Sequence, residues 1–369
     1  GEGLMNGAAI GRLSDELGSE LAIMKGRVDG LEARVNGIEA GSFSDTTTMG
    51  GTAGFLIGAT DSASDANDKV MMEYFYEVDL NTSFTGEDKL NIEIETGNHP
   101  GIGVGADKVG LDWGSDNGDT LKVSDVNYTF PLGGWTVAVG DSMDASKTWP
   151  NACAVNNMVD NLGDCGAANS VDLSGDVSLS ASTEFGDGWE LGLGISADSG
   201  ETSRGIFTNE GDDYYGIAIG YERDTFGFTA AYSMKESTTI ANSTTGWVQS
   251  DNASQKDTTY YGLVGYYSPE STPLTLSGGI ELSDIEGTNT DKTQWTVGVS
   301  TDLGEGTLSA TFGTNGAIAD NAEEIYAYDL SYEYPINDSM SVTPFVYVAE
   351  TTGSTVDTTG AGAFVSFSF

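Results

Sequence analysis

The feature of this sequence that most constrains its fold is an alternation of apolar and polar residues with a period of two, in segments of about ten residues. Successive side chains of a β-strand point to opposite faces, so the alternation predicts strands with one apolar and one polar face. About ten residues is also the length of a tilted strand that crosses a membrane. We predict sixteen strands, at residues 46–59, 70–85, 87–97, 121–130, 134–143, 171–185, 188–199, 212–223, 225–236, 257–268, 273–284, 292–303, 306–315, 323–334, 339–350 and 360–369.

The connections between these segments alternate in length. After the second predicted strand, every second connection is a tight turn, and the intervening loops are long and polar. An even number of strands with short turns on one side is typical of an outer-membrane barrel, whereas a soluble β-sandwich has no reason to segregate its loops. The predicted fold class is therefore all-β, a 16-stranded antiparallel transmembrane β-barrel. Tight turns are expected at 85–88, 131–134, 186–188, 223–225, 303–306 and 335–338.

Aromatic residues bracket the predicted turns. Such residues also form cross-strand pairs in ordinary sheets, but their recurrence at successive turns favours an interfacial girdle at the periplasmic side of a membrane. The chain also ends on an alternating aromatic strand that closes with Phe369, as strands recognised by barrel-assembly machinery do. The predicted girdle consists of Phe84, Phe130, Trp135, Phe185, Trp189, Tyr221, Phe226 and Tyr334.

Charge and composition exclude several classes of protein. The chain has 57 acidic and 14 basic residues, and its net charge of −43 repels the phosphates of nucleic acids. No window holds the 18 consecutive apolar residues that a spanning helix requires. Aromatic residues make up 10% of the chain, which argues against an acidic disordered protein.

The first forty residues follow a different period. Apolar residues alternate in steps of four and three, which predicts a helix with a heptad seam. The g and e positions carry opposite charges in every pair, which favours a parallel coiled coil over a lone helix packed on a globular core. We therefore predict a periplasmic coiled-coil helix at 1–40 and a β-barrel at 41–369. The seam consists of Leu17, Leu21, Met24, Val28, Leu31, Val35 and Ile38, and the charged pairs are Glu20 with Lys25, Arg27 with Glu32, and Arg34 with Glu39.

Period two also predicts which side chains line the lumen. Apolar residues must face lipid, so their neighbours in sequence face inward, and most of the charged ones are acidic. These carboxylates could simply solvate a wet face, but as a set in a water-filled pore they attract cations. Lys89 and Lys235 are the comparable inward cations. The predicted pore-lining residues are Glu73, Glu77, Asp79, Lys89, Glu93, Glu95, Asp125, Asp172, Asp176 and Glu184.

The longest connection runs from about residue 142 to residue 170, between the fifth and sixth predicted strands, and is the candidate for a loop that narrows the channel. It contains both cysteines of the chain, Cys153 and Cys165, with eleven residues between them. An even pair outside the cytoplasm predicts a disulfide rather than free thiols, worth up to about 3 kcal/mol in the chain-entropy model. The constriction candidates are Asp144, Lys147, Asp160 and Asp164.

Catalysis has little support in the sequence. The sole histidine, His99, lies beside Pro100 in a Gly-rich loop and is expected to be a solvated loop residue rather than a catalytic base. We expect no enzyme activity, no cofactor and no metal site. Two acidic loop segments could bind Ca²⁺ loosely but are better explained as solvated acids: Asp112, Asp116 and Asp119, and Asn209, Glu210, Asp212 and Asp213.

Three stretches resemble the cyanobacterial outer-membrane porins, which resemble the carbohydrate-selective porin family. These are residues 78–90 (VDLNTSFTGEDKL), residues 27–34 (RVDGLEAR) and the terminal Phe369, and the similarity runs from about Leu17 to the C-terminus. Family members usually carry an Arg-rich third strand that ends in Ala-Gly-Asn, whereas residues 90–98 here read LNIEIETGN. In the family a surface-layer-homology domain precedes the coiled coil. The sequence begins at Gly1 with neither that domain nor a signal peptide.

The resemblance and the pattern together predict a passive diffusion channel for ions and small polar solutes in an outer membrane, with a preference for cations. The alternative is a structural tether that joins the outer membrane to the cell wall with a nearly closed barrel. The expected partners are two further copies in a homotrimer, outer-membrane lipid, the permeating solutes, and peptidoglycan or another cell-wall polymer held through the missing N-terminal domain.

Overall fold

The computed structural model describes most of the chain from Thr46 onward. The described residues are 25, 46–61, 69–98, 111, 117–154, 156–198, 200–202, 205–208, 212–236, 257–286 and 291–369. The chain divides into two compact units, Gly1–Thr48 and Met49–Phe369. The predicted coiled coil lies outside the described residues, apart from the helical and exposed Lys25.

The second unit is nearly all β-structure. Its strands agree with most of the predicted segments to within three residues at each end. The described elements are β1 (Thr47–Asp61), β2 (Met71–Thr82), β3 (Lys89–Gly97), β4 (Lys122–Leu132), β5 (Trp135–Asp141), η1 (Asp160–Gly166), β6 (Val177–Phe185), β7 (Trp189–Asp198), β8 (Asp212–Arg223), β9 (Phe226–Lys235), β10 (Thr258–Tyr267), β11 (Leu274–Ile285), β12 (Lys292–Leu303), β13 (Gly306–Thr314), β14 (Ile318–Ala319), β15 (Tyr326–Asn337), β16 (Met340–Ala349) and β17 (Thr358–Ser368).

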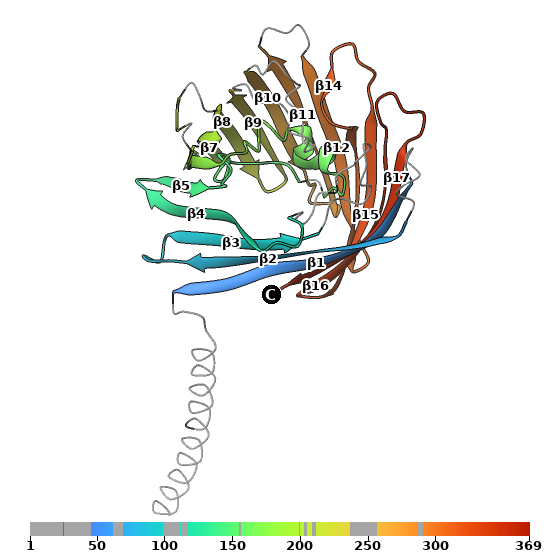
Figure 1. The fold of residues 1–369 in the computed structure, drawn as a ribbon, viewed down its shortest axis with the longest axis horizontal. Helices are drawn as coiled ribbons and strands as arrows, with labels where there is room; N and C mark the ends of the chain where they lie inside the picture. The colour runs from blue at the N-terminus through green and yellow to red at the C-terminus, as the bar shows by residue number, and fades with distance from the viewer. Residues whose placement is uncertain are drawn as a thin grey trace, which may run out of the picture. The chain divides into compact units, whose positions relative to one another are not determined.

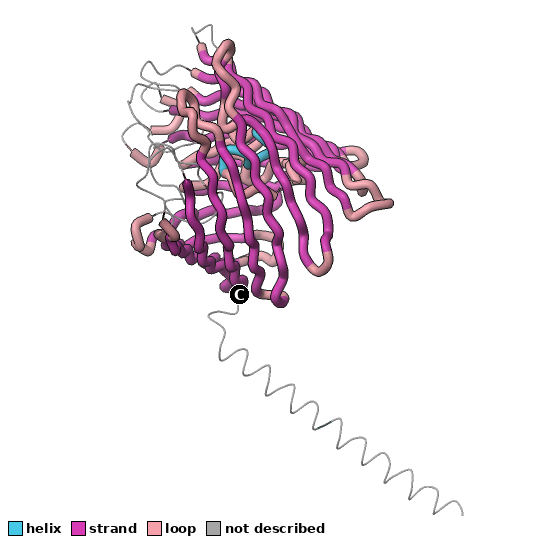
Figure 2. The backbone as a smooth tube through the Cα atoms, turned by 90° about the vertical axis from the view of Figure 1, so that its right-hand side faces the viewer, coloured by secondary structure: helices cyan, strands magenta, loops and turns pink. Residues whose placement is uncertain are grey.

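The strands form one closed antiparallel barrel. Each strand pairs with its neighbours in sequence, and β1 pairs with both β17 and β2, which closes the sheet. The two-residue β14 pairs with β12 just beyond the end of β13. Among the described residues, sixteen strands therefore make up the barrel wall, as the sequence predicts. Figures 1 and 2 show these strands running side by side around the barrel.

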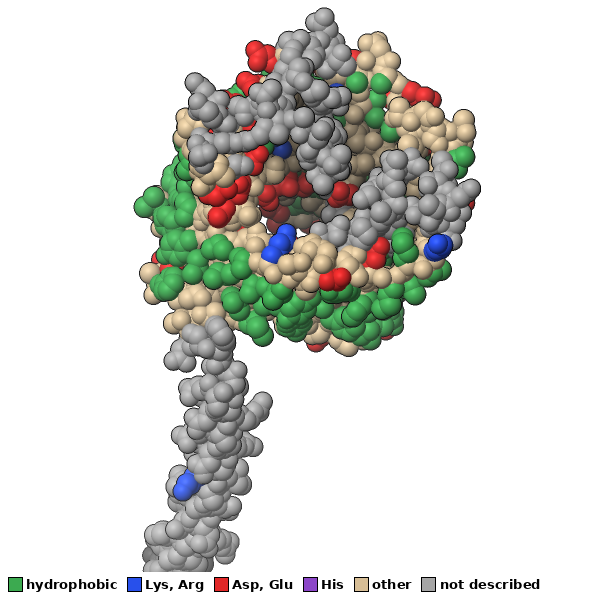
Figure 3. Space-filling view, in the orientation of Figure 1, with side chains coloured by type: hydrophobic (Ala, Val, Ile, Leu, Met, Phe, Trp, Pro, Cys, Tyr) green, Lys and Arg blue, Asp and Glu red, His purple; other side chains and the backbone are tan. Residues whose placement is uncertain are grey.

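The two faces of the wall differ as the alternation requires. Large apolar side chains project from one face of nearly every strand and are exposed, whereas the opposite face carries mostly small, polar and acidic side chains. A barrel that spans a membrane needs this apolar outer band because no water is present to solvate polar groups there. Green apolar side chains cover much of the outer surface in Figure 3. Exposed examples are Phe55, Ile57, Tyr76, Leu193, Ile217, Tyr261, Leu263, Leu282, Val297, Leu330 and Val346.

Tight turns join the strands at one end of the barrel. Between β4 and β5, Leu132 pairs with Trp135 around Gly133 and Gly134, whose φ angles are 58° and 91°. Positive φ at both central residues defines the hairpin turn whose twist fits antiparallel strands, and glycine adopts it without a steric penalty.

The aromatic residues predicted near these turns make ring contacts with one another. Phe185 stacks on Trp189, with ring centroids 6.3 Å apart, and Trp189 contacts Tyr221 at 4.8 Å. Tyr221 contacts Phe226 at 5.8 Å, so the contacts continue from the β6–β7 turn to the β8–β9 turn.

Within the described residues, no helix is long and apolar enough to cross a membrane, a finding that says nothing about crossing by strands.

One strand boundary differs from the prediction. The sixth strand begins at Val177 rather than at residue 171. Residues 171–176 continue the preceding loop, in which Val171 and Leu173 are buried against the inner wall of the barrel. Their apolar character comes from this contact and not from a membrane-facing strand.

Candidate pore and constriction

The β5–β6 connection, residues 142–176, folds against the inside of the barrel, and we call it the inner loop. Its 3₁₀-helix η1 contacts β11, β12 and β13 and is the green coil beside them in Figure 1. Glycines on the inward face of the wall make this contact possible. A Cβ atom at Gly216 would lie 2.4 Å from the Trp149 ring, and one at Gly262 would lie 2.0 Å from Ser170 Oγ. The missing side chains at these glycines therefore leave room on the inner wall for the loop.

A buried carboxylate on β11 holds one part of the inner loop. Glu281 is 2% exposed and accepts four hydrogen bonds, from the backbone N–H and side-chain amide of Asn169 and from the backbone N–H and hydroxyl of Ser170. These bonds measure 2.7–3.0 Å. A buried carboxylate needs such donors, since an unpaired charge is costly away from water.

A second carboxylate, on β15, holds another part of the inner loop. Asp329 is 5% exposed and accepts hydrogen bonds from the backbone N–H groups of Met158 and Val159 and from the Thr311 hydroxyl. Lys235 on β9, predicted as an inward cation, also contacts the loop, because its ammonium donates to Asn169 Oδ1 at 3.2 Å and to Ser174 Oγ at 3.1 Å. Three charged side chains of the wall therefore bind the inner loop: Glu281, Asp329 and Lys235.

The predicted disulfide is present within the inner loop. Cys153 and Cys165 are joined, with their Cα atoms 5.6 Å apart. Cys165 is fully buried against the inner wall of the barrel. The disulfide thus closes a segment that the barrel wall also holds.

The inward face of β2 and β3 carries carboxylates in direct register, and we call Glu77, Asp79, Glu93 and Glu95 the acidic wall. Glu77 lies opposite Glu95, and Asp79 lies opposite Glu93. Carboxylate oxygens of Glu77, Glu93 and Glu95 lie within 4.8 Å of one another. Like charges directly opposite each other repel, so a nearby cation stabilises this arrangement. Red acidic side chains are visible inside the central opening in Figure 3.

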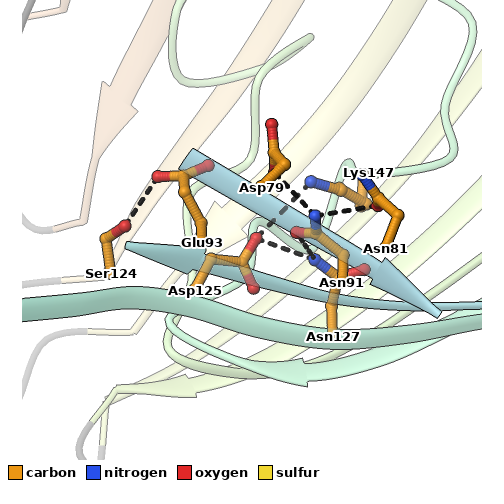
Figure 4. Close-up of polar contacts among 8 residues, drawn as sticks. All are labelled: Asp79, Asn81, Asn91, Glu93, Ser124, Asp125, Asn127 and Lys147. Carbon is orange, nitrogen blue, oxygen red and sulfur yellow. Dashed lines mark hydrogen bonds and ion pairs between the residues drawn. The ribbon is translucent and has the colours of Figure 1, made fainter. Parts of the chain in front are cut away.

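Amides and one lysine border the acidic wall (Figure 4). Asn91 Nδ2 donates to Asp79 Oδ1 at 2.6 Å, and Asn127 Nδ2 donates to Asn91 Oδ1 at 3.2 Å. Asn127 also donates to Asp125 Oδ2 at 2.9 Å, and Lys147 of the inner loop approaches the same oxygen at 3.5 Å. The network joins β2, β3 and β4 to the start of the inner loop.

A β-bulge changes the predicted lining on β4. The register shifts between Glu93 and Ile94, so that Lys122, opposite Glu95, faces the lumen together with Asp125. Lys122 Nζ lies 2.8 Å from Glu95 Oε1. On β12, Lys292 shares the inward face with Gln294, whose amide donates to the inner loop. Lys122 and Lys292 therefore join Lys89 and Lys235 as inward cations, and parity missed Lys122 because of the bulge.

The remaining predicted lining residues fall into different environments. Glu73 is only 5% exposed, whereas Lys89 is exposed near the β2–β3 turn. Asp172 and Asp176 belong to the inner loop, so strand parity does not apply to them, and Asp172 accepts a hydrogen bond from Ser146 Oγ at 2.9 Å. Glu184 is exposed at the turn end of β6.

The four constriction candidates all lie on the inner loop. Lys147 reaches Asp125 on β4, as described above. Asp160 opens η1, and Asp164 accepts a hydrogen bond from Asn151 Nδ2 at 3.3 Å. Asp144 keeps contact with water, but confinement within the barrel and the nearby Asp172 raise its pKa to about 6. Of the four, Lys147 contacts the pore-lining Asp125, and Asp144 places a titratable carboxyl within the barrel, so these two bear most directly on the lumen.

Parts of the predicted Ca²⁺ segments lie outside the described residues, as does His99. The members outside the described residues are Asp112, Asp116, Asn209 and Glu210. Among the described members, Asp119 accepts a hydrogen bond from Tyr74 Oη at 2.8 Å, and Asp213 accepts one from the backbone N–H of Phe207 at 3.2 Å.

Sequence reasoning missed Glu281 and Asp329. Strand parity would have placed both on the inward face, beside the apolar outward residues Leu282 and Leu330. Parity could not reveal that a loop more than 100 residues away in sequence covers them. The strand sequences predict that both carboxylates face inward, but they do not identify the loop residues that cover them.

Comparisons with known proteins agree with this architecture. Residues 223–369 match the sequence profile of the Gram-negative porin family. An uncharacterized protein of Nostoc sp. is 27% identical over 395 aligned positions, which span 92% of this chain and 68% of that protein.

Solved porin structures have a similar fold. An anion-selective porin from Comamonas acidovorans aligns with a TM-score of 0.60 at 11% identity, over 88% of this chain and 99% of its own. A loop-deletion mutant of OmpT from Vibrio cholerae aligns at 0.58 and 13% identity, over 88% of this chain and 100% of its own. A mutant of Rh. blastica porin aligns at 0.52 and 14% identity with the same coverage. At these identities the likeness concerns the fold alone.

Proposed function

We propose that this cyanobacterial porin-like chain is a passive channel that admits small solutes across an outer membrane and prefers cations. The apolar outer band supports insertion in a membrane, and the polar inner face supports a water-filled lumen. The partial match to the Gram-negative porin family and the porin folds are consistent with this role.

The observation that carries the cation preference is the acidic wall. Strand register places Glu77, Glu93 and Glu95 close together, whereas the inner loop covers the carboxylates on β11 and β15. Lys122 offsets only part of their charge. Fixed carboxylates in a narrow passage raise the local concentration of cations and repel anions.

Reversal potentials in a KCl gradient test the proposal directly. The wild-type channel should prefer K⁺, and the preference should weaken as salt rises, because the Debye length falls from about 8 Å at physiological salt to about 3 Å at 1 M. Glu93→Gln/Glu95→Gln should lower the preference while leaving stepwise openings intact.

Two outcomes would contradict the proposal. A wild-type preference for chloride, or an unchanged cation preference in the double variant, would show that the acidic wall does not face the narrow part of the pore. A folded protein that never conducts would leave only the tether to the cell wall as its role.

The assembly we propose is a trimer in the outer membrane, joined on the periplasmic side to a cell-wall polymer through the N-terminal helix. Contacts between barrel walls are expected to hold the trimer. Native mass measurement after deletion of residues 1–40 should therefore still give a trimer, whereas monomers would assign the contact to the helix.

A further inference from the structure

Lys147 is the only basic residue of the inner loop, and its ion pair with the barrel wall is a loose one. Its ammonium lies 3.5 Å from Asp125 Oδ2 on β4, and its side chain is 38% exposed. Charge-assisted hydrogen bonds usually measure about 2.7–2.9 Å. Lys122 forms such a bond, because its ammonium lies 2.8 Å from Glu95 Oε1. Lys147 is therefore a weakly held cation in contact with water inside the barrel.

Two buried amides give Asp125 a donor that does not depend on Lys147 (Figure 4). Asp79 as a carboxylate can only accept, so its 2.6 Å bond to Asn91 fixes Asn91 Nδ2 toward β2 and Asn91 Oδ1 toward Asn127. Asn127 Nδ2 then donates both to Asn91 and to Asp125 Oδ2, the latter at 2.9 Å. Asn91 and Asn127 are 5% and 1% exposed, so water does not compete for these bonds. The wall itself therefore holds Asp125.

The position of Lys147 brings its charge next to the acidic wall. Asp125 lies directly opposite Glu93 in the β3–β4 register. Side chains at opposite positions have Cβ atoms about 4.5–5.5 Å apart, which is less than the Debye length of about 8 Å at physiological salt. Glu93 itself accepts a hydrogen bond from the uncharged Ser124. The ammonium of Lys147 is therefore close enough to offset the field of Glu93.

From this arrangement we infer that Lys147 is a specificity-determining residue that limits the cation preference of the channel. Its ammonium repels permeating cations and offsets carboxylate charge at the edge of the acidic wall. The inference rests on the proposed channel and deepens it, because it names the residue that sets how strong the preference is.

A purely mechanical role for Lys147 gives a different expectation. If the ion pair only fastened the inner loop, breaking it from either side would have the same effect on the channel. A charge in the lumen predicts opposite effects. Removal of Lys147 leaves the negative charge of Asp125 unpaired, whereas removal of the Asp125 charge leaves Lys147 unpaired beside Glu93. The signs of the two effects therefore distinguish the two roles.

Reversal potentials in a KCl gradient, measured on the full chain, give the K⁺/Cl⁻ permeability ratio of each variant. Lys147→Met should raise this ratio about 2-fold or more, and Asp125→Asn should lower it by a similar factor, since each changes one unit charge close to the permeating ions. Lys147→Arg should keep the wild-type ratio, because it keeps the charge. An unchanged ratio in Lys147→Met, or changes of the same sign in Lys147→Met and Asp125→Asn, would overturn the inference.

Lys69→Met is the control matched in charge. Lys69 is exposed and precedes β2, so the variant removes the same charge outside the strands of the barrel wall. The permeability ratio should stay unchanged. An equal rise in Lys69→Met would show that the net charge of the protein, and not the place of Lys147, sets the ratio, and the inference would fail.

Chemical modification tests the exposure of Lys147 without a conductance measurement. A water-soluble acetylating reagent should modify Lys147, whereas Lys235, which donates to Asn169 and Ser174, should be protected. Peptide mass spectrometry measures the acetylation of both side chains. Protection of Lys147 would contradict its contact with water and overturn the inference.

These measurements separate the inference from the proposed channel. A cation-selective wild type whose ratio does not respond to Lys147→Met would overturn the inference and leave the channel. A wild type that prefers chloride would overturn the proposed cation preference, and a rise of the ratio in Lys147→Met would then still support the role of Lys147. A protein that never conducts would overturn the channel, and the inference with it.

Discussion

Carboxylates on two parts of the inner wall of the barrel have different surroundings. On β3, Glu93 and Glu95 border the lumen, where Glu93 accepts a hydrogen bond from Ser124 Oγ and Glu95 forms an ion pair with Lys122. On β11 and β15, Glu281 and Asp329 are covered by the inner loop and bind its backbone N–H groups. An inward carboxylate therefore contributes to pore charge or to loop docking according to what covers it, and not according to its place in the strand pattern.

The sharpest way to break this comparison is the same substitution on each side. Glu281→Gln should lower the free energy of unfolding by about 4 kcal/mol, because the new amide N–H₂ faces donors and leaves buried groups unpaired. The measurement is denaturant unfolding in detergent, with limited proteolysis of residues 142–176 as a second readout.

Glu95→Gln is the matched control for that experiment. It removes an ion pair to the half-exposed Lys122, and such pairs contribute at most about 1 kcal/mol. Equal destabilisation by both variants would show that the acidic wall is as structural as the docking side.

Removal of the disulfide sharpens the comparison on the covered side alone. Cys153→Ser/Cys165→Ser should lower the free energy of unfolding by about 3 kcal/mol in the chain-entropy model. The cation preference should stay unchanged, since both cysteines lie on the inner loop and not on the acidic wall. A shift in the KCl reversal potential without a loss of stability would show instead that the disulfide positions the pore lining.

The smallest expected effect concerns Asp144, which lies on the inner loop and has a pKa raised to about 6. A carboxyl with this pKa is ionised above it and neutral below it, so acidification through about pH 6 removes one negative charge from the lumen. The cation preference should fall slightly as the pH is lowered across this range.

Asp144→Asn isolates that contribution. The variant should show the reduced preference at neutral pH and lose this step in the pH profile of the reversal potential. An identical profile in wild type and variant would mean that another carboxyl accounts for the step.

Sequence alone was sufficient for most of the strands because each strand of a transmembrane barrel must meet the same local requirement. Each strand must present apolar side chains to lipid at every second position, as Phe55, Ile57, Leu263 and Val346 do, and no distant partner is needed to recognise that pattern. The tight turns and the loop that carries both cysteines were predictable for the same reason.

The bulge on β4 and the docking of the inner loop were decided only by tertiary structure. A bulge depends on how two strands pair, so the sequence of β4 could not show that Lys122 turns inward toward Glu95. Nor could it show that Glu281 would be covered by Asn169 and Ser170, because that contact joins segments over 100 residues apart. The sequence determined the inward face of the regular strands, whereas the fold decided the orientation of Lys122 beyond the bulge and which inward residues meet water, because strand pairing and burial depend on distant segments that periodicity does not encode.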